Sequence, residues 1–287
     1  MTQSTLNVSS VVQRYRSELF SIYPVREIEQ FIALVFDDVM HFSKIEIFIN
    51  GDTLVSTVHL ALFETVLEGL KEQQPIQYLL GQTVFYGLPM RVNPDVLIPR
   101  PETEELVHWI LKDELKKYPR VIDLGTGSGC IALALKDQLK EATVYGVDNS
   151  VAALNIAMEN ARRNELEVEF FHFDILLKES LEFMNFDLMV SNPPYVTQQD
   201  RRFMSPNVLD NEPHSALFVY HDDPLIFYRK IVDLAEGHLN RSGKLYFEIN
   251  EAFGNEILQF LKDRGFVHVE MKKDFNGRDR MIRGTKP

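Results

Sequence analysis

"VIDLGTGSGCIALAL", Val121–Leu135, is the stretch that decides the fold of this chain. Apolar residues with strand propensity lead into a loop with three glycines, and a run with helical spacing follows at once. Glycine permits a sharp turn and a close approach of the backbone to a ligand. Strand, glycine-rich turn and helix in this order are typical of α/β domains that bind nucleosides, although the loop alone would also suit a plain tight turn.

Alternation of strands and helices continues from Arg120 to the end of the chain. We expect helices over residues 130–139, 151–164, 223–239 and 255–265, and strands over residues 120–125, 143–148, 168–174, 186–192, 243–250, 267–274 and 278–286. Strands that alternate with helices predict a mostly parallel sheet covered on both faces. Because the last two strands are consecutive, we expect them to form an antiparallel hairpin at the edge. The pattern therefore predicts a doubly wound α/β domain with seven strands.

The part before residue 101 has a different character. Apolar residues at three- and four-residue steps predict helices over residues 9–23, 24–40 and 55–70, the first of them capped by serines. Residues 75–100 are rich in Gly, Pro and β-branched or aromatic residues, with strands expected at 83–87 and 90–92. We thus predict a small helical domain over residues 1–74, a β-hairpin linker over 75–100 and the α/β domain over 101–287.

Composition excludes several classes of protein. The 287 residues carry a net charge of −12, which disfavours non-specific binding to nucleic acid, since that depends on Lys and Arg. The single cysteine, Cys130, excludes an intrachain disulfide and fits a reducing compartment. We find neither the apolar core of a signal peptide near the start nor an apolar run of about 18 residues. We expect a cytoplasmic protein, monomeric by default and without membrane contact.

An acidic residue follows the glycine-rich loop at the spacing of a ribose ligand. Asp148 ends the second strand, about 20 residues after Gly129, and can accept hydrogen bonds from ribose hydroxyls. A dinucleotide dehydrogenase is the main alternative, with G-x-G-x-x-G and a pyrophosphate at the helix N-terminus. The G-x-G-x-G of Gly125, Gly127 and Gly129 instead suits a ligand without phosphate, such as S-adenosylmethionine. We expect the whole loop, including Thr126 and Ser128, to bind this cofactor.

Two further residues at strand ends are candidates for the cofactor site. Asp174 ends the third strand and could bind an adenine amino group, with Ile175 packed on the ring, although Asp174 could also cap the segment that follows. We interpret Cys130 as a small buried residue and not as a nucleophile, because no pattern of His and Asp partners surrounds it. The eight histidines lack metal-ligand spacing, so we predict no metal site.

"SNPPY", Ser191–Tyr195, follows the fourth strand and therefore lies at the same edge of the sheet. A turn that merely ends the strand is the alternative, because proline stops strands and Asn favours turns. Beside a nucleoside pocket, the Asn192 side-chain oxygen and the Pro193 carbonyl could accept the two N–H bonds of a planar amino group. They would orient its nitrogen and stabilise the positive charge that grows there during methyl transfer. Tyr195 could stack on the planar substrate. Asn192, Pro193 and Tyr195 are the catalytic candidates.

Several segments, in order, resemble one family. "PIQYLLGQTVFYG", "VLIPRPETEELV", "DLGTGSGCIALAL", "SNPPYV", "NEPHSALF" and "FNGRDRMIRG" are similar to segments of the HemK/PrmC-type release factor glutamine methyltransferases. These are class I S-adenosylmethionine-dependent enzymes with a Rossmann-like methyltransferase sheet. The resemblance covers most of the chain from Pro75 to Gly284, and it is most specific where "IPRPETE" accompanies "SNPPY".

The resemblance implies methylation of the glutamine amide in the Gly-Gly-Gln motif of peptide chain release factors, which would be the protein partner. It implies that Asn192 lies between cofactor and substrate and that residues 193–195, with Pro194, hold the glutamine. Four residues would lie near the pocket entrance: Phe85, Arg100, Glu102 and Thr103. Arg100 and Glu102 could equally form a salt bridge between linker and core. Two departures are visible: Ile175 stands where the family often has an aromatic residue, and "EIN", Glu248–Asn250, where it often has "EIG".

Two other functions remain open at this point. An amino methyltransferase for adenine or guanine would share the Asn-Pro-Pro-Tyr turn, but it would require a basic face with stacking aromatic residues. The N-terminal helices are not visibly basic, which counts against it. A catalytically silent binding module would keep the fold, but it would not need the glycine loop, Asn192 and Tyr195 together.

Overall fold

The computed structural model describes residues 6–178, 180–181, 185–219 and 223–287, and the chain divides into two compact units. The first unit comprises Met1–Gly81 and Pro206–Asn211, and the second comprises Gln82–Ser205 and Glu212–Pro287. The first unit thus extends beyond residue 74, where we placed the end of the helical domain, and includes a short helix of the expected linker. None of the helices in the described ranges is long and apolar enough to cross a membrane.

The first unit is a helical bundle. Its helices before residue 82 are α1 (Val8–Leu19), α2 (Val25–Met40), α3 (Lys44–Ile49), α4 (Thr57–Lys71) and α5 (Ile76–Leu80), and α9 (Pro206–Asn211) is assigned to the same unit. Each of the long helices turns its apolar stripe inward, onto a core that contains Tyr15, Phe36 and Phe63. The cap of α1 differs from the expectation, because the side chain of Asn7, not a serine, accepts the backbone N–H of Ser10. Periodicity did not show α3 and α5, which are too short for it.

A two-stranded hairpin opens the second unit, as expected. β1 (Gln82–Phe85) pairs antiparallel with β2 (Leu88–Arg91). The turn between them consists of Tyr86 and Gly87, both with positive φ, at 49° and 82°. Two positive φ values in a two-residue loop match the right-handed twist of the strands, which explains why a glycine stands here.

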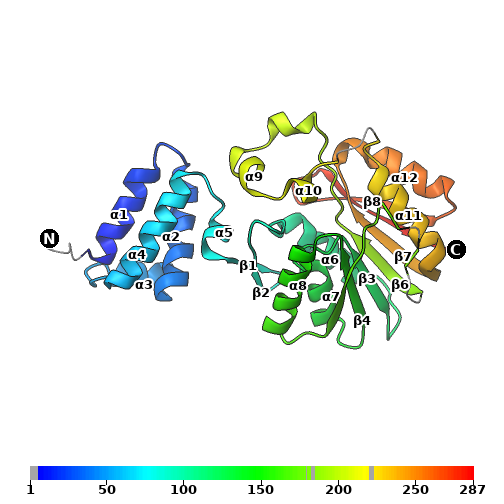
Figure 1. The fold of residues 1–287 in the computed structure, drawn as a ribbon, viewed down its shortest axis with the longest axis horizontal. Helices are drawn as coiled ribbons and strands as arrows, with labels where there is room; N and C mark the ends of the chain where they lie inside the picture. The colour runs from blue at the N-terminus through cyan, green and yellow to red at the C-terminus, as the bar shows by residue number, and fades with distance from the viewer. Residues whose placement is uncertain (1–5, 179, 182–184, 220–222) are drawn as a thin grey trace. The chain divides into compact units, whose positions relative to one another are not determined.

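The second unit is built on a seven-stranded sheet in the order β5-β4-β3-β6-β7-β9-β8 (Figure 1). The first five strands of this order are parallel, whereas β9 pairs antiparallel with both β7 and β8. This confirms the predicted mostly parallel sheet with an antiparallel hairpin at its edge. The strands are β3 (Arg120–Leu124), β4 (Thr143–Asp148), β5 (Val168–His172), β6 (Phe186–Ser191), β7 (Leu239–Glu248), β8 (Val267–Lys273) and β9 (Asp279–Thr285).

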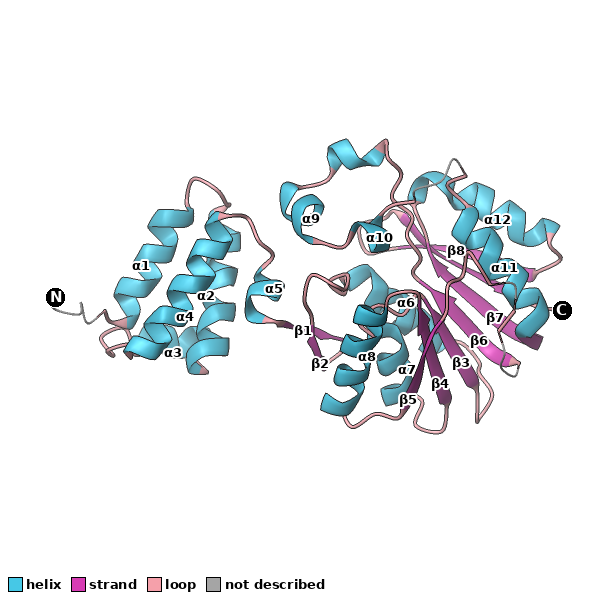
Figure 2. Cartoon of the chain, in the orientation of Figure 1, coloured by secondary structure: helices cyan, strands magenta, loops and turns pink. Residues whose placement is uncertain are grey.

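Helices cover both faces of this sheet, as Figure 2 shows. One face packs on α6 (Pro101–Lys112), α7 (Cys130–Gln138) and α8 (Val151–Arg163), and the other on α11 (Ile226–His238) and α12 (Gly254–Asp263). Successive residues of β3 alternate between the two cores: Val121 belongs to the first and Ile122 to the second. Because both faces are buried, the central strands are continuously apolar.

The strand order reverses at β3, and this reversal locates the functional edge. From β3 the chain moves outward through β4 to β5 and then returns to β6 on the other side of β3. Ligands of open α/β sheets bind outside the carboxyl ends of the strands at such a switch point. The glycine-rich loop follows β3 and Asn192 follows β6, so both lie at this position.

A buried amide helps to attach the hairpin to the sheet domain. The Asn160 side chain on α8 is fully buried. Its Oδ1 accepts the Arg91 N–H at 2.6 Å, and its Nδ2 donates to the carbonyls of Arg91 at 3.0 Å and Ser128 at 2.9 Å. One side chain therefore joins α8, the hairpin and the glycine-rich loop.

We expect Asn160→Ala to lower the free energy of unfolding by about 3 kcal/mol, because it leaves buried backbone groups without partners. Urea unfolding followed by circular dichroism measures the change. Asn164→Ala is the matched control: Asn164 also donates to the hairpin, at the Pro89 carbonyl, but this bond is exposed. Equal and small losses for both variants would contradict the anchoring role of Asn160.

Candidate active site

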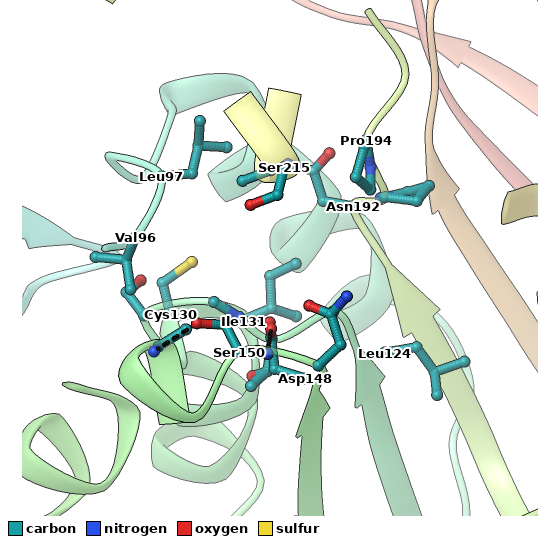
Figure 3. Close-up of a pocket in the computed structure, with 18 of the residues that line it drawn as sticks. Val96, Leu97, Leu124, Cys130, Ile131, Asp148, Ser150, Asn192, Pro194 and Ser215 are labelled. Atoms are coloured by element: carbon teal, nitrogen blue, oxygen red, sulfur yellow. Dashed lines mark hydrogen bonds between the residues drawn. The ribbon is translucent and has the colours of Figure 1, made fainter. Parts of the chain in front are cut away.

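A cavity opens at the carboxyl edge of the sheet, where the loops after β3, β4, β5 and β6 meet. Figure 3 shows Asp148 and Ser150 at one end of it and Asn192, Pro194 and Ser215 at the other. The cavity collects predicted site residues that are far apart in the sequence: Arg100, Gly125, Thr126, Gly127, Ser128, Asp148, Asp174, Ile175, Asn192, Pro193 and Pro194. Three predicted residues, Phe85, Gly129 and Tyr195, do not line it.

Two glycines of the loop after β3 leave room for a ligand. Gly125 and Gly127 have φ values of +75° and +54°, and a Cβ added to either would meet no atom within 4 Å. A Cβ at Gly129 would lie 3.1 Å from the Cβ of Ala157. Gly129 is the N-cap of α7 and lets this helix pack closely on α8, while its contact with a ligand stays a prediction.

Asp148 holds the loop and faces the cavity. Its Oδ2 accepts the Gly127 N–H at 2.8 Å, and its Oδ1 accepts the Ser150 N–H at 2.9 Å. Burial raises the pKa of this carboxyl, and the backbone N–H donors oppose the rise. Each carboxylate oxygen keeps a further lone pair, so Asp148 can also accept from two hydroxyl groups of a ligand.

Asp174 and Ile175 lie together after β5 and line the same cavity. Asp174 Oδ1 accepts the Leu176 N–H at 2.8 Å, which closes a local Asx turn; no helix follows it directly in the described residues, so Asp174 is not a helix N-cap. The second carboxylate oxygen is not used in this turn. Ile175 is 8 % exposed and presents an aliphatic surface where a flat ring could pack.

Asn192 is held by Thr103, which the family resemblance placed near the pocket entrance, and through it by Glu248, which was not assigned to the site. Asn192 Nδ2 donates to Thr103 Oγ1 at 3.2 Å, and Thr103 Oγ1 donates to Glu248 Oε2 at 2.6 Å. The Tyr195 hydroxyl donates to Glu248 Oε1 at 2.9 Å. Thr103 lies on α6 and Glu248 ends β7, and both are almost fully buried. Glu248 could have been found from the sequence, because a charged residue at the end of an apolar strand is a candidate site residue.

Tyr195 does not form a wall of the cavity, which corrects the sequence prediction. Its ring is partly buried against the core that contains Tyr228 and Phe247, and its hydroxyl is bound to Glu248. Burial raises the pKa of Tyr195 well above its ordinary value, and the negative charge of the nearby Glu248 carboxyl raises it further. Tyr195 therefore remains a protonated donor that fixes the Asn-Pro-Pro-Tyr turn from behind.

The chain after this turn is paired with a segment that covers the cavity. Val196 N–H donates to the Leu217 carbonyl at 3.0 Å, and Val219 N–H donates to the Val196 carbonyl at 3.0 Å. The short helix α10 (His214–Leu217) precedes this pairing and brings Ser215 and Ala216 to the cavity. The "NEPHSALF" segment thus forms part of the same site.

Known proteins resemble this chain over nearly its whole length. A family model described as "Methyltransferase small domain" matches residues 103–215. The release factor glutamine methyltransferase of Flavobacterium psychrophilum is 44% identical over 281 residues, which cover 95% of this chain and 98% of the relative. The chain belongs to the release factor glutamine methyltransferase family. The relative of the same name from Bacteroides thetaiotaomicron is 39% identical over 94% of this chain and 97% of its own length.

Solved structures support the fold. A methyltransferase from Pyrococcus furiosus matches with a TM-score of 0.53 at 20% identity, over 70% of this chain and 89% of its own. The hMettl16 catalytic domain, in complex with MAT2A 3′UTR hairpin 6, matches with a TM-score of 0.55 at 16% identity, over 80% of this chain and 82% of its own. At these identities the likeness concerns the Rossmann-like sheet alone.

S-adenosylmethionine is the methyl donor of the release factor glutamine methyltransferase family, and the cavity suits it. The open space beside Gly125 and Gly127 permits close approach of a ligand to the backbone. The carboxylate of Asp148 and the apolar side chain of Ile175 line this same cavity. The G-x-G-x-G spacing of the loop, in place of the G-x-G-x-x-G of dinucleotide-binding folds, favours this ligand over a dinucleotide.

Phe85, which family resemblance placed near the pocket entrance, is a core residue. Its side chain is 1 % exposed and belongs to the core between the sheet and α6, with Leu106 and Ile110. The prediction was wrong because the alternation of β1 turns this ring inward. Arg100 was expected either near the pocket entrance or in a salt bridge. It lines the cavity, and its Nη2 also lies 2.5 Å from Oε1 of the buried Glu212.

Asn250, where the release factor glutamine methyltransferases often have glycine, has a defined function here. Its Nδ2 donates to the Tyr195 carbonyl at 3.1 Å and to Asp200 Oδ2 at 3.3 Å. Its Oδ1 accepts the Ala252 N–H at 3.0 Å and so caps the short 3₁₀ helix Glu251–Phe253. The departure adds a direct bond from the end of β7 to the Asn-Pro-Pro-Tyr turn.

A second buried acid lies beneath the glycine-rich loop. Asp123 is fully buried at the end of β3, and its Oδ2 accepts the Thr126 hydroxyl at 2.6 Å. Within the described ranges, Oδ1 has no hydrogen-bond partner. Burial raises the pKa of Asp123 to about 7, and the neighbouring Asp148 contributes in the same direction. Burial likewise raises the pKa of the Cys130 thiol to about 12, so this cysteine is no nucleophile.

We expect the contribution of Asp123 to the free energy of unfolding to fall as the pH rises from about 4 to about 7, because over this range Asp123 ionises in the unfolded chain. In this window the folded chain keeps the Asp123 proton, which the unfolded chain has released. Asp123→Asn should remove a slope of up to about 1.4 kcal/mol per pH unit. Denaturant titrations of both proteins between pH 4 and 8 measure it. Parallel curves for the two proteins would contradict the raised pKa.

Metal ligation has no support in the described ranges, where no three His, Cys, Asp or Glu side chains are arranged around a common point.

Proposed function

We propose that this chain transfers a methyl group from S-adenosylmethionine to the side-chain amide nitrogen of the glutamine in the Gly-Gly-Gln motif of peptide chain release factors. One observation carries the proposal: the glycine-rich loop, Asp148, Asn192 and Pro193 line one cavity. Membership of the release factor glutamine methyltransferase family supports the choice of substrate. It does not favour the alternative of an adenine or guanine amino methyltransferase.

The chemical task is to make an amide nitrogen react. Its lone pair is delocalised, and the cofactor, when bound, supplies an electrophilic methyl group on a sulfonium. The Asn192 side-chain oxygen and the Pro193 carbonyl accept the two N–H bonds of the glutamine amide. They point the nitrogen at the methyl group and stabilise the positive charge that develops on it. After transfer this nitrogen is acidic and releases its proton, so no strong base is required.

Rigid surroundings support this assignment of roles. Proline fixes the backbone around the accepting carbonyl, since its ring restricts φ. Pro193 is buried, and the turn is bound to Glu248 through Tyr195 and to Asn250 through the Tyr195 carbonyl. The acceptors are thus preorganised before a substrate arrives. Arg100, at the cavity wall, can contact the backbone of the approaching Gly-Gly-Gln segment.

A labelling experiment tests the function. Purified protein is incubated with S-adenosylmethionine labelled on the methyl group, together with a release factor, its Gln→Ala variant, or bulk RNA or DNA. We expect label on the release factor alone and none on the Gln→Ala variant. Label on RNA or DNA, and none on the release factor, would overturn the proposal.

The first unit, in this proposal, recognises the protein substrate. Three apolar side chains of α3 are strongly exposed: Ile45 at 70 %, Phe48 at 88 % and Ile49 at 70 %. Exposed apolar residues that gather on one short element are typical of protein interaction sites. The net charge of −12 also suits a protein partner better than nucleic acid.

We expect Phe48→Ser to raise KM for the release factor about fivefold or more without changing kcat, because it removes binding that is equal in ground and transition states. Steady-state kinetics with a full-length release factor measure both constants. Tyr118→Ser is the control. Tyr118 is an exposed aromatic residue just before β3, at the amino ends of the strands, whereas the cavity lies at their carboxyl ends. An unchanged KM for Phe48→Ser would exclude α3 from the contact.

We further propose that the enzyme acts as a cytoplasmic monomer without direct nucleic-acid contact. Its acidic charge and single cysteine support this. Light scattering coupled to size exclusion tests the monomer, and a mass near twice 33.2 kDa would contradict it.

A further inference from the structure

We propose that Thr103 and Glu248 are positioning residues that fix the orientation of the Asn192 side-chain amide, so that its oxygen and not its NH2 group faces the substrate. The inference rests on the proposed function, in which Asn192 must present its oxygen, not its NH2 group, to the substrate amide. An asparagine amide has two ends of nearly equal shape, so shape alone does not choose between them. A hydrogen-bond partner of fixed polarity has to make that choice.

The three side chains form a continuous chain of hydrogen bonds. Asn192 Nδ2 lies 3.2 Å from Thr103 Oγ1, and Thr103 Oγ1 lies 2.6 Å from Glu248 Oε2. Thr103 is 2 % exposed and Glu248 is 1 % exposed. The three residues come from α6, the end of β7 and the loop after β6, so the fold itself brings them together.

The polarity of the chain follows from the carboxylate. Burial raises the pKa of the Glu248 carboxyl, and the hydrogen bonds from the Thr103 and Tyr195 hydroxyls and the charge of Arg280 oppose this rise. In its ionised form the carboxylate only accepts hydrogen bonds, so the single proton of the Thr103 hydroxyl is directed to Glu248. Thr103 Oγ1 can then only accept from Asn192, and it selects the NH2 end of the amide. The Asn192 oxygen is left pointing away from Thr103, and Asn192 lines the cavity. Glu248 thus determines, through Thr103, that an acceptor faces the substrate.

The rest of the cluster keeps Glu248 in place as an acceptor. The Tyr195 hydroxyl donates to Oε1 at 2.9 Å, so each carboxylate oxygen receives a hydroxyl. The guanidinium of Arg280 lies over the Tyr195 ring, 6.0 Å from its centroid, and donates to the Ile249 carbonyl at 3.1 Å. This cation, itself paired with Asp274 at 3.3 Å, supplies a positive charge beside the buried carboxylate.

Thr103→Val tests the inference because valine keeps the shape of threonine and removes the hydroxyl. Without it the Asn192 amide can turn over, and its NH2 group then faces the N–H bonds of the substrate. We expect kcat for release-factor methylation to fall about 10-fold or more, with the dissociation constant of S-adenosylmethionine unchanged. Thr103→Ser, which keeps the hydroxyl, should retain most of the wild-type rate.

A double-mutant comparison separates positioning from a merely structural role. If Thr103 acts through Asn192, then Thr103→Val should lower kcat little further in an Asn192→Ala background, where there is no amide to orient. Equal fold-losses in both backgrounds, or full activity of Thr103→Val, would overturn the inference. Should Thr103→Val not fold, as judged by thermal unfolding and calorimetric cofactor binding, Thr103→Ala replaces it in the same comparison. A wild-type protein that labels no release factor would instead overturn the proposed function.

Discussion

Asn192→Ala loses methyl transfer by about 10²- to 10³-fold and keeps its affinity for S-adenosylmethionine; this is the largest effect we expect. The substitution removes the side-chain oxygen that accepts one N–H bond of the glutamine amide, an interaction that strengthens as charge grows on nitrogen. Cofactor affinity depends on other residues, chiefly the glycine-rich loop and Asp148. Single-turnover transfer of labelled methyl groups measures the rate, and calorimetry measures the affinity.

Asn255→Ala is the matched control for this prediction, because Asn255 is an exposed asparagine on α12. It should leave both rate and affinity at the wild-type level. If Asn192→Ala turned over as fast as the control, the acceptor role given to Asn192 would be wrong.

Asp148→Ala should weaken S-adenosylmethionine binding about 10- to 100-fold, the second large effect. The substitution removes a carboxylate that accepts ribose hydroxyls. It also frees the Gly127 N–H, now bound at 2.8 Å, and so loosens the loop that the cofactor contacts. Calorimetric titration with the cofactor measures the dissociation constant, and saturating cofactor should restore most of kcat.

Asp137→Ala provides the comparison for Asp148. Asp137 lies on α7 in the same unit but pairs with Lys140 at the surface. Its cofactor affinity should equal that of the wild type. An Asp148→Ala variant with the same affinity as this control would remove the ribose assignment.

The fold could be predicted from the sequence because its signals are local. The alternation of apolar strands and amphipathic helices determines the layers, and the glycines between β3 and α7 mark the turn of a nucleoside site. The same local logic located Asp148 and Asn192, since each ends a parallel strand and such ends share one edge. The alternation of strands and helices did not predict the strand order at the antiparallel edge of the sheet, where β9 lies between β7 and β8.

Side-chain roles that depend on distant partners could not be predicted. Thr103 and Glu248 are separated by 145 positions, and only the packed fold shows their hydrogen bond. Tyr195 looked like a stacking residue because an exposed ring after a turn suits that role, but Glu248 draws its hydroxyl into the core. Phe85 was misplaced for the same reason: a hairpin register, not composition, turns its ring inward.

The role of Asn250 could not be predicted from the sequence either. The residue type alone did not indicate a role, because an asparagine in a loop suits many positions. In the folded chain its amide binds the Tyr195 carbonyl and its oxygen caps a 3₁₀ turn. The first bond stiffens the segment that carries Asn192 and Pro193, and the second fixes Asn250 in place.

Mass spectrometry of a release factor treated with this protein and S-adenosylmethionine tests the central claim most directly. Fragmentation of the peptide that contains Gly-Gly-Gln locates the added methyl group to a single side chain. We predict one methyl group on the glutamine of that motif, and none after treatment with Asn192→Ala under the same short reaction time. A methyl group on another residue, or an unmodified glutamine where the cofactor has been consumed, would contradict the account.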